Sequence, residues 1–228
     1  MSLVCHPIVE GRHPLTLASR PLPPTVGSMN NQGFWLSLRW LGKVAAISAL
    51  GILAVLVGLY LHVKSNFNLH AVEAGLVYRS GQLSPARLAS LVRDAGIRSV
   101  INLRGEQVGV EWYNQELSIT QALGVTLINY PISARSVLSG EQLQKLSALI
   151  RDAEKPVLIH CSGGADRTGL ACAVYCFDAG QPRNRTREQL SAYFGHFPHL
   201  LWQDAAAMDI SLERYLYLAR ISLAGDAQ

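Results

Sequence analysis

The feature that most constrains this chain is the segment HCSGGADRTG at residues 160–169, which places Cys161 six positions before Arg167. A glycine-rich loop of this length can curl so that successive backbone N–H groups converge on one centre. Such a loop forms a concave anion-binding nest at the start of a helix. The same N–H groups stabilise a sulfur anion and favour a thiolate nucleophile at Cys161. Arg167 supplies a planar guanidinium that can hold two phosphate oxygens.

The surroundings of this segment predict a strand, a loop and a helix in that order. Residues 155–159 (KPVLI) indicate a short buried strand, and residues 167–179 (RTGLACAVYCFDA) an apolar helix that ends before Gly180. The alternative is a cysteine that only fills a core beside a glycine turn. A sulfur-transfer domain of the rhodanese type also uses a cysteine in an anion-binding loop, but His160 and residues 167–169 (RTG) argue against it.

Residues 160–169 resemble the signature of the cysteine-dependent protein tyrosine phosphatase superfamily, His-Cys-x-x-Gly-x-x-Arg-Ser/Thr-Gly, at every fixed position. Residues 77–82 (VYRSGQ) and 101–104 (INLR) are similar to the compact, dual-specificity-like phosphatases of bacteria and fungi. The resemblance implies an α/β fold, a three-layer sandwich with a central mixed sheet. It also implies a phosphoric monoester hydrolase that forms a phosphocysteine and needs no metal or cofactor.

The resemblance assigns roles within the segment. Cys161 is the expected nucleophile, and Arg167 holds the phosphate together with the loop amides. Thr168 is placed to hydrogen-bond the thiolate or to help expel it, and His160 is expected to brace the loop through its ring. The expected substrate-binding residues are those of the loop itself, Ser162, Gly163, Gly164, Ala165, Asp166 and Arg167.

The general acid is absent from its usual place. Members of the superfamily commonly carry an aspartate on a separate loop before the cysteine, but residues 130–135 (YPISAR) contain none. Asp166 is our candidate catalytic acid, because myotubularin lipid phosphatases and certain bacterial phosphatases have a similar Asp-Arg-Thr loop. A salt bridge from Asp166 to Arg167 or to a neighbour is the alternative, and Glu106 is a second candidate acid.

An apolar run of 20 residues without a formal charge, residues 44–63, is long enough to cross a bilayer core of about 30 Å as a helix. We expect one transmembrane anchor in a bacterial inner membrane. A cleaved signal peptide and a buried helix are the alternatives, but the run is longer than a signal core of about 7 to 15 residues. Arg39 and Lys43 precede the run and Lys64 follows it, which favours a catalytic domain outside the cytoplasm.

The chain thus divides into a disordered, cytoplasmic segment (1–43), the anchor (44–63) and a phosphatase domain (72–228). The first 28 residues are proline-rich, and Met29 is an alternative start. In the domain, hydrophobic patterns predict strands at 97–103 and 125–130. They also predict helices at 85–95 and 111–123, and a third helix that starts with a capping box of Ser139 and Gln142. Further along, we expect a short helix capped by Thr186 that reaches residue 194, and a long helix at 200–223.

Composition and charge limit the classes of molecule that this protein is expected to bind. The formal net charge is +4, from 20 basic and 16 acidic residues, but no basic patch interleaved with aromatics predicts nucleic-acid binding. The expected substrate is a phosphorylated protein, cleaved by a tyrosine or dual-specificity phosphatase. The anchor makes a membrane lipid phosphate one alternative, and the missing loop aspartate makes a catalytically weak phosphate-binding module another.

The four cysteines, Cys5, Cys161, Cys172 and Cys176, do not form the pattern of a disulfide or zinc framework. Cys172 and Cys176 share one face of the helix after the loop. We expect them to pack as small apolar side chains, and the alternative is that one of them resolves an oxidised Cys161.

Overall fold

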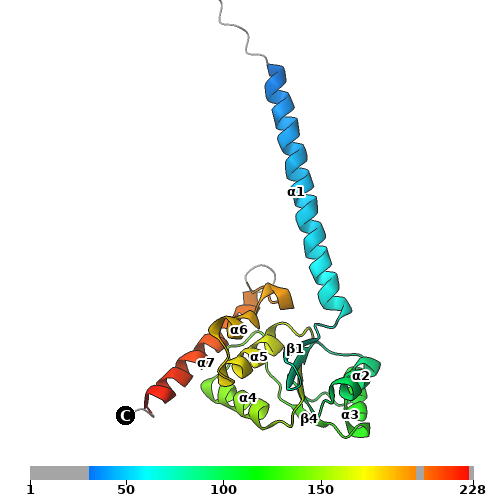
Figure 1. Cartoon of the computed structure of the whole chain (residues 1–228), viewed down its shortest axis with the longest axis vertical. Coiled ribbons are helices and arrows are strands. Elements are labelled where there is room, and N and C mark those ends of the chain that lie inside the picture. Colours follow the sequence, from blue (N-terminus) through cyan, green and yellow to red (C-terminus); the bar gives the residue numbers. More distant parts are fainter. Residues whose placement is uncertain (1–30, 199–202, 226–228) are drawn as a thin grey trace, which may run out of the picture. The chain divides into compact units, whose positions relative to one another are not determined.

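The structure, a computed structural model, describes residues 31–198 and 203–225. Its core is a five-stranded mixed sheet in the order β1-β2-β5-β3-β4 (Figure 1). Only β1 is antiparallel to its neighbour, and the other pairs are parallel. The strands span β1 (His70–Glu73), β2 (Val77–Ser80), β3 (Ser99–Asn102), β4 (Thr126–Asn129) and β5 (Val157–His160). The expected α/β fold with a mixed sheet is confirmed, and the first strand begins two positions before the expected domain start.

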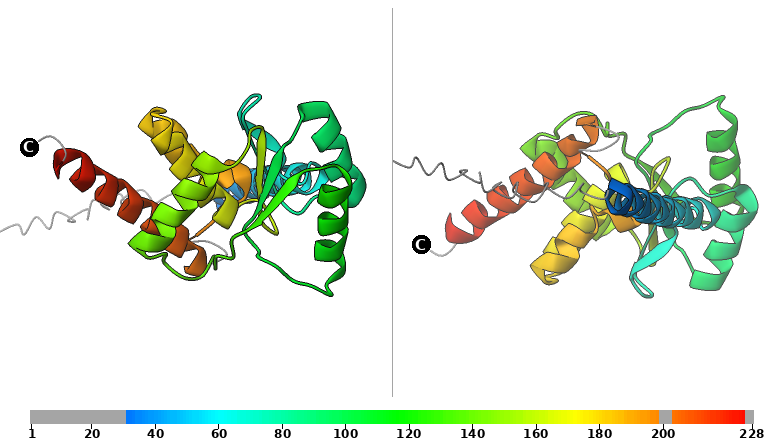
Figure 2. Two further views of the ribbon diagram at one scale, coloured as in Figure 1. Left: turned by 90° about the horizontal axis from the view of Figure 1, so that it is seen from below. Right: turned by 90° about the horizontal axis from the view of Figure 1, so that it is seen from above.

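Helices cover both faces of the sheet, which gives three layers (Figure 2). Helices α2 (Pro85–Ala95) and α3 (Glu111–Ala122) lie on one face, and α4 (Gly140–Asp152), α5 (Asp166–Asp178) and α7 (Ala206–Gly225) on the other. Because successive side chains of a strand point to opposite faces, β5 serves both cores. Val157 and Ile159 join the core under α5, and Leu158 joins the core under α2.

Local sequence signals fix several helix boundaries. The Ser84 side chain accepts a hydrogen bond from Arg87 N at the start of α2, and Gly96 ends this helix in the left-handed conformation with φ 66°. At α4, Ser139 and Gln142 form the expected capping box, in which each side chain bonds the other residue's backbone N–H. These predictions are confirmed. The sequence was sufficient for them, since a cap depends on residues only a few positions apart.

The chain after α5 differs from the prediction. Thr186 does not cap a helix but lies buried inside α6 (Arg183–Glu188), which starts after Pro182 and ends well before residue 194. At the end of this helix, the Gln189 carbonyl accepts a hydrogen bond from Arg79 on β2. The long C-terminal helix α7 begins at Ala206, after a short 3-10 turn, and residues 200–202 of the prediction lie outside the described residues.

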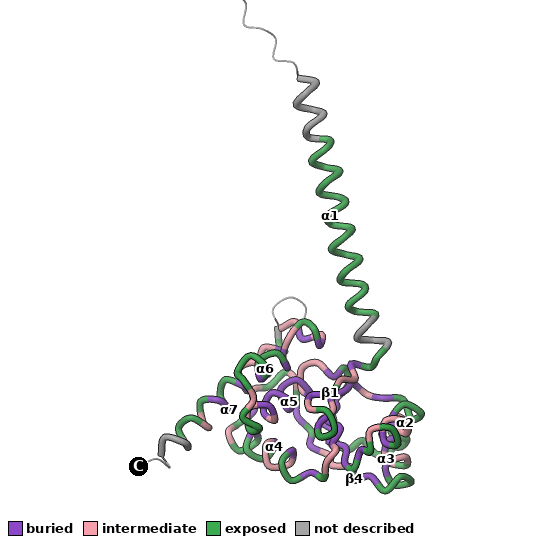
Figure 3. The backbone as a smooth tube through the Cα atoms, viewed as in Figure 1, coloured by how far each residue is buried: buried purple, intermediate pink, exposed green. Residues whose placement is uncertain are grey.

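Helix α1 (Asn31–Ser65) contains the predicted span. Its stretch Arg39–Leu61 is long and apolar enough to cross a membrane, and the residues of this stretch are exposed (Figure 3). The helix starts earlier than predicted, so residues 31–43 are helical rather than disordered. No proline interrupts this stretch, and its Leu and Trp residues are compatible with helix. The predictions for residues 1–28, including disorder, fall outside the described residues.

Candidate active site

The site forms where three parallel strands end. Ser80 and Asn102 both lie in register with His160, so the carboxyl ends of β2, β3 and β5 meet at one edge of the sheet. In open α/β sheets, ligands bind at the carboxyl ends of the strands. Here the segment after β5, residues 161–167, is the signature loop, and it leads directly into α5.

The signature loop directs a backbone N–H group at the Cys161 sulfur. Cys161 is buried, and the Gly164 N–H donates a hydrogen bond to its Sγ at 3.2 Å. A backbone N–H directed at the sulfur, close to the start of a helix, stabilises negative charge on it. The loop thus presents a backbone donor to the Cys161 sulfur, and the role of Cys161 as nucleophile stays a prediction.

Gly164 is required by the packing of this loop. Its φ is +72°, and an added Cβ would lie 2.5 Å from Gly81 N in the turn after β2. The two segments also share a hydrogen bond from Gln82 N to Ser162 O at 3.0 Å. The loop conformation thus depends on a close contact with a segment about 80 positions earlier in the chain, which only glycine permits.

Arg79 supports the signature loop from inside the protein. This residue is completely buried on β2, and its Nη2 donates to Gly164 O at 2.8 Å. Its Nη1 donates to the carbonyl and side-chain oxygens of Gln189, at 3.0 and 2.8 Å. Burial lowers the pKa of Arg79. We did not predict this role, although Arg79 lies in the VYRSGQ stretch at residues 77–82.

His160 lies against the loop backbone. Its Nδ1 is 3.4 Å from Cys161 O, and its Nε2 is 3.0 Å from Glu116 Oε1 on α3, with both side chains buried. The ring therefore contacts the start of the loop, as expected for a bracing residue. Glu116 was missed, because nothing in its local sequence distinguishes it from an exposed helical glutamate.

The Thr168 hydroxyl bonds to the backbone of β2. Its hydroxyl donates to Ser80 O at 3.4 Å and makes no hydrogen bond to Cys161 Sγ among the described residues. It thereby links the first turn of α5 to β2. Arg167 extends from the same turn to the end of β3, where its Nη1 donates to Leu103 O at 3.4 Å.

Asp166 pairs with a histidine rather than with Arg167. Its Oδ1 is 2.7 Å from His196 Nδ1, and His196 Nε2 is 3.0 Å from Asp209 Oδ2 on α7. Burial lowers the pKa of His196, but hydrogen bonds to Asp166 and Asp209 outweigh this effect and raise it to about 9. His196 is therefore an imidazolium at neutral pH that joins the loop to α7. Glu106 is exposed and forms no hydrogen bond or ion pair within the described part of the chain.

Cys172 and Cys176 pack in the core under α5. Burial raises the pKa of Cys172 to about 12 and that of Cys176 to about 11, so both thiols are protonated at neutral pH. This favours the packing interpretation over a resolving thiol. Cys5 lies outside the described residues.

Across residues 31–198 and 203–225, the structure contains no group of three or more His, Cys, Asp or Glu side chains that could hold a metal ion.

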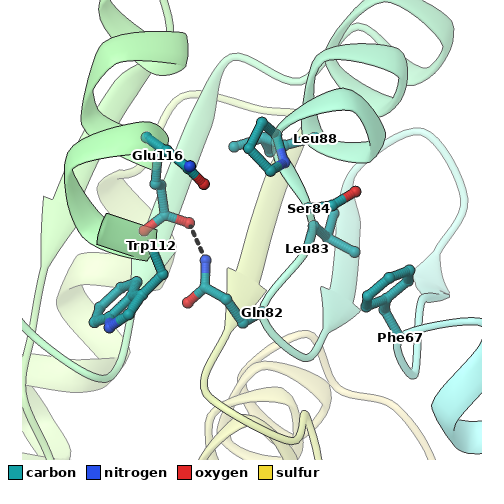
Figure 4. Close-up of a pocket in the computed structure, with 9 residues that line it drawn as sticks. Phe67, Gln82, Leu83, Ser84, Leu88, Trp112 and Glu116 are labelled. Atoms are coloured by element: carbon teal, nitrogen blue, oxygen red, sulfur yellow. Dashed lines mark hydrogen bonds between the residues drawn. The ribbon is translucent and has the colours of Figure 1, made fainter. Parts of the chain in front are cut away.

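A pocket of about 220 Å³ opens beside the loop, between α2 and α3 (Figure 4). Gln82 forms part of its wall and donates a hydrogen bond to Glu116 Oε1 at 3.1 Å. The remaining wall is largely apolar and aromatic, and includes Phe67, Leu83, Leu88 and Trp112.

A strand, a loop with a cysteine and an arginine, and a helix, placed at the end of a mixed sheet, are the arrangement of the cysteine-dependent, dual-specificity-like phosphatases. Residues 58–197 match the family model described as DSP-PTPase phosphatase fused to NAD+ kinase. The chain belongs to this family of dual-specificity-like phosphatase domains. Comparison with curated proteins finds no match.

Two solved structures with a TM-score of 0.50 have the fold of this chain. The core catalytic domain of the PP-IP phosphatase SIW14 from S. cerevisiae is 18% identical with a TM-score of 0.50, over 67% of this chain and 93% of that one. PTPMT1 is 14% identical with a TM-score of 0.50, over 67% of this chain and 98% of that one. TpbA from P. aeruginosa is 24% identical with a TM-score of 0.46, over 67% of this chain and 92% of that one.

Proposed function

We propose that this protein is a cysteine-dependent phosphomonoesterase of the protein tyrosine and dual-specificity type, which acts through a phosphocysteine intermediate. The observation that supports this most is the hydrogen bond from Gly164 N to Cys161 Sγ at 3.2 Å, in a loop that ends in Arg167. A protein that only binds phosphate needs the amides and the guanidinium, but it has no need of a stabilised sulfur nucleophile.

In the first step, the Cys161 thiolate attacks phosphorus in line with the leaving oxygen. The S–P bond forms as the P–O bond to the leaving group breaks. Arg167 and the loop amides, from Ser162 to Asp166, hold the equatorial oxygens and their growing charge. The leaving oxygen takes a proton from an acid, for which Asp166 is our candidate.

In the second step, water attacks the phosphorus of phosphocysteine. Asp166, now deprotonated, accepts a proton from this water, the S–P bond breaks, and inorganic phosphate leaves with Cys161 again a thiolate. His196 holds Asp166 Oδ1 in both steps at 2.7 Å, while the carboxylate remains 30% exposed and accessible to substrate. His160 braces the loop, and Thr168 fixes α5 against β2.

The substrate proposal follows from the leaving group. The loop at residues 130–135 carries no aspartate, and the imidazolium of His196 engages Asp166, so acid assistance is weaker than in an enzyme with a free acid. A phenol, with a pKa of about 10, leaves more readily without a proton than an aliphatic alcohol does. Phosphotyrosine is therefore the favoured substrate.

A membrane lipid phosphate is the second candidate, because α1 contains an apolar stretch, Arg39–Leu61, that could span a membrane. We propose that residues 44–63 anchor the protein as a single-pass membrane protein. The cations before the run favour a catalytic domain outside the cytoplasm. Held near a bilayer, the domain would encounter lipid head groups at high local concentration.

The test is phosphate release by the full chain in nonionic detergent, from phosphotyrosine peptide and from lipid phosphomonoesters in parallel. Wild-type release that Cys161→Ser abolishes supports the enzyme, and the relative kcat/KM values rank the two substrate classes. Asp166→Asn is expected to lower kcat by about 10²-fold, and to affect lipid esters more than aryl esters. Binding of phosphate analogues without release from any substrate would instead indicate a binding module.

A further inference from the structure

Arg104 lies beside the signature loop but has no part in the chemistry described above. It follows β3 directly, and its backbone N–H donates to Asn102 Oδ1 at 2.9 Å. The preceding residue, Leu103, donates its N–H to His160 O at 2.9 Å and accepts from Arg167 Nη1 at 3.4 Å. The backbone of Arg104 is thus fixed next to both ends of the loop.

The Arg104 side chain is held in one position by two contacts. Its Nη1 donates to Gln82 Oε1 at 2.8 Å, and its Cζ lies 3.4 Å from the centroid of the Trp112 ring. Gln82 is itself fixed, because its N–H donates to Ser162 O and its side chain donates to Glu116. A guanidinium that is already ordered loses little entropy when it binds an anion.

Within the described residues, Arg104 is not paired with an acidic side chain. In the described part of the chain, no carboxylate lies within ion-pair distance of Arg104 or Arg167. The closest acidic contact of this region, Glu116, faces His160 and Gln82. Burial lowers the pKa of Arg104 and the charge of Arg167 lowers it further, while the weaker effects of Glu116 and Cys161 raise it.

We propose that Arg104 forms a second anion-binding position at the rim of the phosphatase site, and that the substrate is a phosphomonoester with a second anionic group close to the scissile phosphate. This inference rests on the proposed function. Arg167 binds the phosphoryl group that is transferred, and Arg104 binds a carboxylate or a second phosphate on the same molecule. The neighbouring aromatic surface of Trp112 contacts the uncharged part between the two anions.

The test compares substrates that differ only in this charge. The full chain in nonionic detergent is assayed with the ortho, meta and para isomers of carboxyphenyl phosphate and with the matching neutral carbamoylphenyl phosphates. The variant is Arg104→Gln, and the control is Arg98→Gln, which removes an exposed arginine paired with Glu154 before the other end of β3. The ratio of kcat/KM between the charged and neutral esters is compared across proteins, so that intrinsic leaving-group reactivity cancels.

We expect at least one carboxyl isomer to show a ratio about tenfold higher in wild type and in Arg98→Gln than in Arg104→Gln, the scale of a charge-assisted hydrogen bond. Arg104→Lys, which keeps the charge, is expected to retain part of the preference. Equal ratios in wild type and Arg104→Gln for all three isomers would overturn the proposal. So would an Arg104→Gln variant that loses activity equally on charged and neutral esters, which would indicate a purely structural role.

Failure of the proposed function gives a different result. Phosphate release that persists in Cys161→Ser would reject the cysteine mechanism whatever the ratios are. If wild type cleaves nothing, calorimetric binding of carboxyphenyl and carbamoylphenyl phosphonates still tests Arg104. A preference for the carboxyl compound that disappears in Arg104→Gln supports the anion position, and its absence in wild type rejects it.

Discussion

His196 is buried between Asp166 and Asp209, and we predict that its protonation stabilises the folded domain in a pH-dependent way. The perturbation is His196→Gln, which keeps a polar side chain of similar length but cannot carry the charge. The histidine contributes hydrogen bonds to both carboxylates, at 2.7 and 3.0 Å, and its side chain is 2% exposed. Because the His196 side chain is buried, water weakens its electrostatic interaction with the two carboxylates only slightly.

The magnitude follows from the raised pKa. The pKa of His196 in the folded protein is about 9, against an ordinary value of 6.5. At about 1.4 kcal/mol for each factor of ten in proton affinity, this difference corresponds to about 3 kcal/mol of folding free energy. Because the folded state binds the proton more tightly, the contribution is complete below about pH 6.5. It declines as pH rises towards 9 and is absent above about pH 10.

The assay is urea unfolding of the full chain in nonionic detergent, followed by tryptophan fluorescence from pH 6 to pH 10. Groups common to both proteins cancel in the difference between wild type and His196→Gln. This difference is expected to be about 3 kcal/mol larger at pH 6 than at pH 10, because only its pH-dependent part comes from the raised pKa. Asp209→Asn, which removes one of the two acceptors, is expected to shift the decline to lower pH. A difference that stays constant over this range would refute the reasoning.

Two further predictions concern the loop and the helix behind it. Gly164→Ala is expected to cost at least about 2 kcal/mol in unfolding free energy, because φ is +72° and the new Cβ would lie 2.5 Å from Gly81 N. Gly163→Ala, where nothing lies within 4 Å, is the control, and equal losses of stability would contradict this account. Cys172 and Cys176, with pKa values raised by burial to about 12 and about 11, are expected to resist maleimide at pH 8 until the chain unfolds. Peptide mass spectrometry measures this, and labelling of both in the folded chain would count against it.

Features that depend on neighbouring residues could be predicted from the sequence. The caps at Ser84 and Ser139 and the strand, loop and helix around Cys161 each involve a few consecutive positions, whose conformational preferences act locally. The prediction at Thr186 failed for the opposite reason. Its helix ends at Gln189, whose carbonyl accepts a hydrogen bond from Arg79, 110 positions earlier in the chain.

The sequence alone determined the family and predicted the core of the site, because residues 160–169 place the sulfur, the amides and the guanidinium in one short loop. The tertiary structure decided what surrounds that loop. Arg79 reaches Gly164 across 85 positions, and His196 reaches Asp166 across 30. Such partners depend on the order of the strands and on which helices cover each face. Those contacts are set by packing of the whole core, whereas the chemistry of the loop is contained in its own ten residues.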